Sequence, residues 1–187
     1  SRRAKRGVPI VSILGYTNAG KSTLLNALTD SNVIAEDKLF ATLDTRSRRI
    51  RFPREREVII TDTVGFIRDL PKDLFAAFRA TFEEAQDADL LLHVIDVADG
   101  ALPEHLETTE LVLGKLGLAG VPRLAVFNKM DRCPLGDARR IAAGRGGIAV
   151  CALDRQSLLP LLREIERRLY PDGEETLLEE DVPITAS

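Results

Sequence analysis

Eight consecutive residues near the start of the chain have the types and spacing of a phosphate-binding loop. They fit the pattern G-x-x-x-x-G-K-[ST] at every position: Gly15, Tyr16, Thr17, Asn18, Ala19, Gly20, Lys21 and Ser22. An apolar run precedes the loop and a helix-like run that includes Thr23 follows it, so a helix N-terminus adds positive potential. We therefore predict a nucleoside-triphosphate site, with Lys21 on the β- and γ-phosphates and the Ser22 hydroxyl on Mg²⁺.

A carboxylate motif lies 40 residues after Ser22, directly behind the apolar run 57–61. It consists of Asp62, Thr63, Val64 and Gly65. A carboxylate at a strand end can hold Mg²⁺ through water, and the Gly65 N–H can bind a γ-phosphate. D-x-x-G alone is common, and its position after a predicted strand makes it informative.

A third motif indicates guanine as the base. Asn128, Lys129, Met130 and Asp131 follow the apolar run 123–127. Asp131 would accept from N1–H and the amino group of guanine, an arrangement that adenine lacks. Asn128 would tie this loop to the phosphate loop, and the Lys129 stem would lie over the base. A polar turn after a strand is the alternative, which the order of the three motifs disfavours.

A short segment after the last apolar run is a weaker candidate for base binding. It consists of Cys151, Ala152 and Leu153. The Ala152 N–H would donate to guanine O6.

The elements that must position these motifs alternate between apolar and amphipathic runs, which predicts an α/β fold. Predicted strands are 9–14, 47–52, 57–61, 89–95, 122–127 and 147–151. Predicted helices are 21–29, 72–86, 104–117, 136–143 and 155–169. We expect three layers around a mainly parallel six-stranded sheet with one antiparallel edge strand.

Length and composition suit one ordinary domain. The chain has 187 residues, 44% of them hydrophobic, and a net charge of −3, so no global charge argues for nucleic acid. The two cysteines, Cys133 and Cys151, are too few for a disulfide framework, which favours the reducing cytoplasm. No apolar run approaches the roughly 20 residues needed to cross a bilayer. We divide the chain into a basic segment 1–6, a nucleotide-binding domain 7–170 and an acidic tail 171–187, and expect a monomeric piece of a longer protein.

The wording of the motifs resembles one family. GYTNAGKSTL, LFATLD, DTVGFIRDLP, LLLHVID and NKMD together are similar to the GTPase domain of HflX proteins, ribosome-associated GTPases of the translation-factor-related class. The resemblance covers roughly 7–170. It implies GTP binding and hydrolysis, large-subunit and ribosomal RNA partners, and a role in splitting or rescuing stalled ribosomes.

The resemblance also assigns roles at the site. Thr42 becomes the switch threonine that joins Mg²⁺ and the γ-phosphate, with residues 30–45 and 63–72 as the two switch loops. Metal ligands are then Ser22, Thr42 and Asp62, and the catalytic set is Lys21, Thr42 and Gly65. Phe66 stands where many GTPases carry a glutamine, which implies slow unaided turnover. Asn18 is a candidate for coordinating potassium; the alternative is that it only braces the loop.

The remaining charged and histidine residues admit two interpretations each. The arginine run 46–56 alternates with Ile50 and Phe52, as in a strand with one solvated face; the alternative is a ribosomal RNA contact. His93 lies in an apolar run and is predicted to be a core residue. His105 has no evident partner in the sequence. As alternative functions, a nucleotide-sensing interaction module stays open, whereas Asp131 disfavours an ATPase.

Overall fold

A central β-sheet organises the computed structural model, which describes residues 7–16, 19–29, 47–52, 56–62, 84–134, 136–171 and 185–186. Its strands are β1 (Ile10–Gly15), β2 (Ser47–Phe52), β3 (Arg56–Asp62), β4 (Leu90–Asp96), β5 (Arg123–Asn128), β6 (Ile148–Ala149) and β7 (Thr185–Ala186). The order is β6-β5-β4-β1-β3-β2-β7. The pairs β1–β3, β1–β4, β4–β5 and β5–β6 are parallel, whereas β2 runs antiparallel to both β3 and β7.

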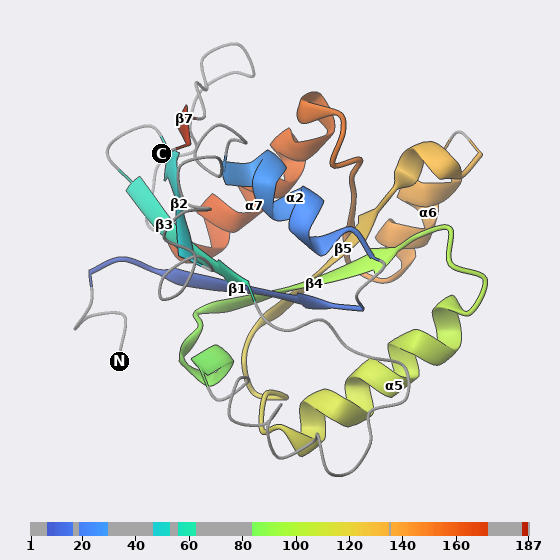
Figure 1. Cartoon of the computed structure of the whole chain (residues 1–187), viewed down its shortest axis with the longest axis horizontal. Coiled ribbons are helices and arrows are strands. Elements are labelled where there is room, and N and C mark those ends of the chain that lie inside the picture. Colours follow the sequence, from blue (N-terminus) through green and yellow to red (C-terminus); the bar gives the residue numbers. More distant parts are fainter. Residues whose placement is uncertain are drawn as a thin grey trace, which may run out of the picture.

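Helices cover both faces of this sheet (Figure 1). They are α2 (Lys21–Thr29), α5 (Leu102–Lys115), α6 (Asp137–Gly144) and α7 (Leu159–Leu169), with short 3-10 turns η2 (Glu84–Asp87), η3 (Met130–Arg132) and η4 (Arg155–Leu158). One face packs the apolar sides of α2 and α7 against alternate residues of the strands. The opposite face packs against α5 and α6. The predicted three-layer architecture is therefore confirmed.

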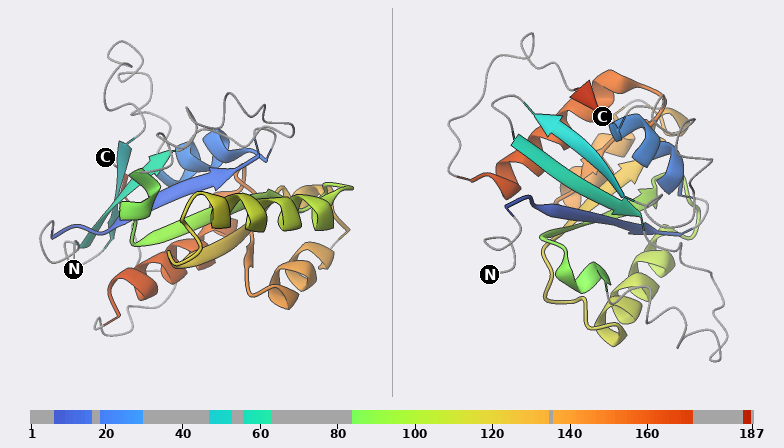
Figure 2. Two further views of the ribbon diagram at one scale, coloured as in Figure 1. Left: turned by 90° about the horizontal axis from the view of Figure 1, so that it is seen from below. Right: turned by 60° about the vertical axis from the view of Figure 1, so that its left-hand side comes forward.

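Side-chain alternation explains how the strands serve both layers. Val11 and Ile13 of β1 face the α2 and α7 layer, whereas Ile10 and Leu14 face α5. Such strands read as continuous apolar runs because both of their faces are buried. The antiparallel pair β2–β3 (Figure 2) alternates instead between buried residues and residues that are partly or fully exposed.

The six predicted strands are all present, and two predictions about the sheet need correction. The predicted strand 147–151 is reduced to Ile148–Ala149. The sheet also has a seventh strand, because β7 pairs with β2, so β2 is antiparallel but is not the edge. Nothing in the apolar pattern marks the two residues of β7, which pair with Ile50 and Arg51 of β2.

Helix boundaries differ in ways that local chemistry explains. The predicted helix 155–169 divides into η4 and α7, because the Asp154 carboxylate accepts the Gln156 N–H at 3.1 Å and the first turn is 3-10. The predicted helix 104–117 begins two residues earlier, at Leu102, with Pro103 in its first turn, where proline is tolerated. Of the predicted helix 72–86, only the last three residues are described, and they form part of η2. The loop 30–45 lies outside the described residues.

Candidate nucleotide-binding site

The predicted site residues gather where the parallel strands end. Gly15 ends β1, Asp62 ends β3, Asp96 ends β4 and Asn128 ends β5, and these strands are neighbours in the sheet. Their carboxyl ends therefore meet at one edge, which is where open α/β sheets bind ligands.

The two motif glycines are required because other parts of the chain approach them closely, a backbone at Gly15 and a side chain at Gly20. A Cβ on Gly15 would lie 2.4 Å from the carbonyl oxygen of Val94 on β4. Gly20 has φ +83°, and a Cβ there would lie 2.6 Å from Nδ2 of Asn128. Glycine is thus needed for close packing at both positions and also for the backbone angle at Gly20.

Lys21 and Asp62, predicted for phosphate and Mg²⁺, lie in direct contact. The Lys21 ammonium forms an ion pair with Oδ1 of Asp62, and Lys21 is only 7% exposed. Ser22 and Thr23 follow on the first turn of α2 and are exposed. The first N–H groups of a helix have no partner within it, which suits an anion. Ser22 offers a hydroxyl and Asp62, in contact with the neighbouring Lys21, offers a carboxylate; these are the oxygen donors that Mg²⁺ takes, so the residues fit that ion.

Asn128 joins three loops of the site. Its side chain is buried, and Nδ2 donates to the carbonyl oxygen of Ala19 in the phosphate loop at 3.0 Å. Its Oδ1 accepts the Ala152 N–H at 3.2 Å. The first bond is the link between loops that the sequence predicts. The second involves the N–H predicted to bind guanine O6, so a base carbonyl would share this donor with Asn128 or displace it.

Lys129 is held in an uncommon conformation beside the phosphate loop. Its φ is +65°, in the left-handed region. Its ammonium donates to Oδ2 of Asp96 at 3.1 Å, and its Cε lies 3.5 Å from the position of a Cβ on Gly20. The stem of Lys129 therefore runs along the phosphate loop, next to the turn that carries Asp131.

Asp131 is exposed and makes one contact with a buried thiol. Sγ of Cys151 donates to its Oδ1 at 3.5 Å. Burial is the main cause that raises the pKa of the Cys151 thiol, so the thiol stays protonated and remains a donor. Met130 N–H donates to the carbonyl of Val150 at 3.1 Å, which seats the turn on the end of the sheet. Leu153 is 83% exposed and makes no contact with this turn in the hydrogen bonds described.

Some predicted residues cannot be placed. Thr17, Asn18, Thr42, Thr63, Val64, Gly65 and Phe66 lie outside the described residues. Within the described part, no three His, Cys, Asp or Glu side chains are grouped to hold a metal. None of the described helices has both the length and the apolarity to span a membrane.

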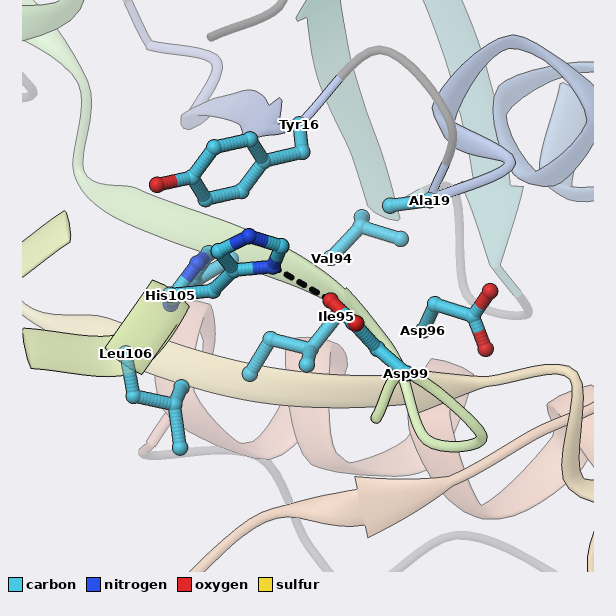
Figure 3. Close-up of a pocket in the computed structure, with 9 residues that line it drawn as sticks. Tyr16, Ala19, Val94, Ile95, Asp96, Asp99, His105 and Leu106 are labelled. Carbon is cyan, nitrogen blue, oxygen red and sulfur yellow. Dashed lines mark hydrogen bonds and ion pairs between the residues drawn. The ribbon is translucent and has the colours of Figure 1, made fainter. Parts of the chain in front are cut away.

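His105, for which the sequence shows no evident partner, has two partners in the structure. Its ring stacks on Tyr16 of the phosphate loop, with centroids 4.4 Å apart, and its Nδ1 bonds to Oδ2 of Asp99 (Figure 3). These residues, with His93 and Asp96, line a pocket under the loop. Sequence reasoning missed the cluster because Tyr16 is a variable position of the motif and lies far from His105 along the chain. His93 is 4% exposed, as predicted for a core residue.

The arginine run has the predicted two-faced strand. Ile50 and Phe52 are buried, whereas Arg49 and Arg51 are about half exposed and pair with one carboxylate, Glu57, at 3.0 and 3.1 Å. The charge of the exposed face is thus partly compensated within the hairpin.

A mainly parallel sheet with a phosphate loop after β1 and an Asn-Lys-x-Asp turn after β5 defines the class of P-loop GTPase domains. Residues 10–129 match the family of 50S ribosome-binding GTPases, and the chain belongs to that family.

Within this family, the chain is similar to proteins named GTPase HflX. The chain is 50% identical over 176 residues to the GTPase HflX of Caldanaerobacter subterraneus, covering 92% of this chain and 40% of that protein. It is 53% identical over 129 residues to the GTPase HflX of Escherichia coli, covering 69% of this chain and 30% of that protein. The chain thus spans less than half the length of these curated relatives.

Solved structures have the same fold. A GTP-binding protein of Sulfolobus solfataricus in complex with GDP superposes with a TM-score of 0.71 at 29% identity, covering 91% of this chain and 55% of that one. Era in complex with MgGDPNP and nucleotides of 16S ribosomal RNA superposes with a TM-score of 0.62 at 27% identity, covering 95% and 61%.

Proposed function

We propose that this chain is the switch domain of an HflX-like GTPase, binding GTP and GDP with Mg²⁺ and hydrolysing GTP. The observation that carries the proposal is the bond from Asn128 to Ala19, which holds the phosphate loop against the proposed base-binding turn. Lys21, Ser22 and Asp62 would then meet the phosphates and Mg²⁺, and the Sulfolobus relative with bound GDP supports a guanine nucleotide.

Asp131 would select the base. Its carboxylate is exposed, and Oδ1 accepts a hydrogen bond from Sγ of Cys151. Among the hydrogen bonds of the described residues, none involves Oδ2, so this oxygen can accept from a ligand. A carboxylate can accept from N1–H and the amino group of guanine. Xanthine has a carbonyl at the second position, so an amide side chain would suit it better.

Replacing Asp131 by asparagine is therefore the test of the proposed function. We expect Asp131→Asn to lose at least about tenfold in GDP affinity, by analogy with other lost charged hydrogen bonds, and to gain affinity for XDP. Calorimetric titration with GDP, XDP and ADP measures this directly. The control is Asp137→Asn, which changes a carboxylate on α6 outside the site. Failure of the unchanged chain to bind GDP, or equal base preference in both proteins, would contradict the assignment.

Hydrolysis would proceed by in-line attack of water on the γ-phosphorus. Lys21 and the backbone N–H groups would stabilise the charge that develops on the phosphate oxygens, with Thr42 and Gly65 contributing from the switch loops. Mg²⁺ bound to Ser22, Thr42 and Asp62 would neutralise phosphate charge. Because Phe66 cannot orient water as glutamine does, we expect unaided turnover on the order of 10⁻⁴ to 10⁻² per second.

The Asn18 side chain is proposed to coordinate potassium next to the phosphates, which would add a cation where other GTPases use an arginine. Turnover that is equal in sodium and potassium chloride at matched ionic strength would refute this.

The partner is proposed to be the large ribosomal subunit, in the cytoplasm, with the protein acting as a monomer that splits or rescues stalled ribosomes. The family assignment and the RNA-bound Era relative support this. Arg49 and Arg51 are the exposed cations of β2, although Glu57 already compensates part of their charge. A nucleotide-sensing module that binds another protein is the competing function. Stimulation of GTP turnover by isolated large subunits favours the first, and no stimulation favours the second.

A further inference from the structure

Tyr16 of the phosphate loop stacks on His105, which in turn bonds to Asp99 in the turn between β4 and α5. Its ring stacks on His105 of α5 at 4.4 Å and an interplanar angle of 26°. Nδ1 of His105 bonds to Oδ2 of Asp99, and Oδ1 of Asp99 accepts the Ala101 N–H at 2.9 Å. Figure 3 shows the two rings one above the other, with Asp99 on the side of His105 away from Tyr16. We call Tyr16, His105 and Asp99 the loop support.

The chemistry of His105 indicates a positioned ring rather than a core filler. Its Nε2 is buried without a hydrogen-bond partner among the described residues. An apolar ring would make the same stack without the cost of an unpaired buried nitrogen. What the imidazole adds is the bond from Nδ1 to Asp99, which fixes the ring plane on which Tyr16 lies.

The turn that carries Asp99 also reaches the other half of the site. Asp96, three residues earlier, accepts the Lys129 ammonium at 3.1 Å and the Ala98 N–H at 2.9 Å. Both carboxylates of this turn are therefore fixed by backbone N–H groups two residues on. One short segment between β4 and α5 holds the phosphate loop through His105 and the base-binding turn through Lys129.

We propose that His105 is a positioning residue for the phosphate loop, acting through Tyr16, and that the β4–α5 turn aligns the phosphate and base halves of the site. The proposal rests on the proposed function, that a guanine nucleotide binds here. A loop held in its binding conformation loses less entropy when it closes on phosphate. From the stabilisation that a stacked aromatic pair provides, we expect the loss of this pair to weaken GDP binding about 2- to 12-fold.

The test is GDP titration of the His105→Ala variant in the presence of Mg²⁺, at a temperature where circular dichroism finds every variant folded. Thr108→Ala is the matched control, because Thr108 is an exposed residue on the same helix. We expect about 2- to 12-fold weaker binding in His105→Ala, no change in Thr108→Ala, and partial recovery in His105→Phe, which keeps the ring. Equal affinity of His105→Ala and the unchanged chain would overturn the proposal, as would a phenylalanine variant as weak as alanine.

A double-mutant cycle separates the route through Tyr16 from a general loss of stability. If His105 acts through Tyr16, adding His105→Ala to Tyr16→Ala should change GDP affinity by less than twofold. Full additivity of the two losses would contradict that route. Failure of the unchanged chain to bind GDP would refute the proposed function instead, so the two failures are distinguishable.

Discussion

At Gly15 the chain leaves β1 beside Val94 of β4, to which it is directly paired. The position of a Cβ there is 2.4 Å from a backbone oxygen, which cannot move without breaking the strand pair. Gly15 is also the first residue of the phosphate loop. Both the packing of the sheet and the path of the loop therefore depend on the absence of a side chain at this position.

We expect Gly15→Ala to lower the free energy of unfolding by about 2 kcal/mol or more, because the added methyl group would clash with a backbone oxygen that is held in the sheet. The matched control is Gly114→Ala on α5, where a Cβ would meet nothing within 4 Å. That change should raise stability by up to about 1 kcal/mol, since alanine favours a helix interior. Urea unfolding measures both, and a Gly15→Ala variant as stable as Gly114→Ala would contradict the packing argument.

At the scale of elements, α7 is attached to the β2–β3 hairpin by polar contacts as well as by its apolar face. Arg56 at the start of β3 pairs with Glu166 of α7 at 3.0 Å, and both side chains are mostly buried. The Arg56 guanidinium also lies 5.5 Å from the centroid of the Tyr170 ring, and the Tyr170 hydroxyl donates to the carbonyl of Glu57 at 2.7 Å.

We expect Arg56→Ala to cost about 3 kcal/mol of stability, because it leaves the Glu166 carboxylate buried without its cation. Arg167→Ala is the control: that arginine is 70% exposed and pairs with Glu164, so its loss should cost far less stability than the loss of Arg56, because solvent screens an exposed pair. Thermal unfolding followed by circular dichroism compares the two. Similar losses would mean that the Arg56 pair is effectively solvated.

Much of this element scale could be predicted from the sequence, because apolar runs bury strands on both faces and the motifs lie at strand ends. The order of β1, β3, β4 and β5 along the sheet edge brings the predicted phosphate and base residues together. What could not be predicted depends on contacts between distant segments. The stack of Tyr16 on His105 has no periodic signal, and the strand β7 that pairs with β2 is only two residues long.

At the scale of the whole molecule, a buried histidine connects stability to pH. Burial, aided by the nearby charge of Arg123, lowers the pKa of His93 from 6.5 to about 4. The unfolded chain therefore binds a proton near pH 6.5 that the folded chain takes up only near pH 4. Stability is fully present above the higher value, falls as pH decreases between the two, and changes no further from this cause below pH 4.

From this pKa difference we expect the chain to lose about 2 kcal/mol more between pH 7 and pH 5 than a His93→Gln variant, which has no proton to bind there. Urea unfolding at both pH values gives the two differences, and other titrating groups cancel in the comparison. The same pH dependence in both proteins would show that His93 is not the group responsible.

Lys129 has a consequence for any effort to make this protein more robust. Among the described residues it is the one non-glycine side chain with a positive φ, a conformation that glycine adopts without strain. Selection for heat resistance alone would therefore favour glycine at this position. Glycine would remove the ion pair to Asp96 and the side-chain stem beside Gly20. Thermal stability and nucleotide binding therefore favour different residues at position 129, so a screen for stable variants needs to measure nucleotide binding as well.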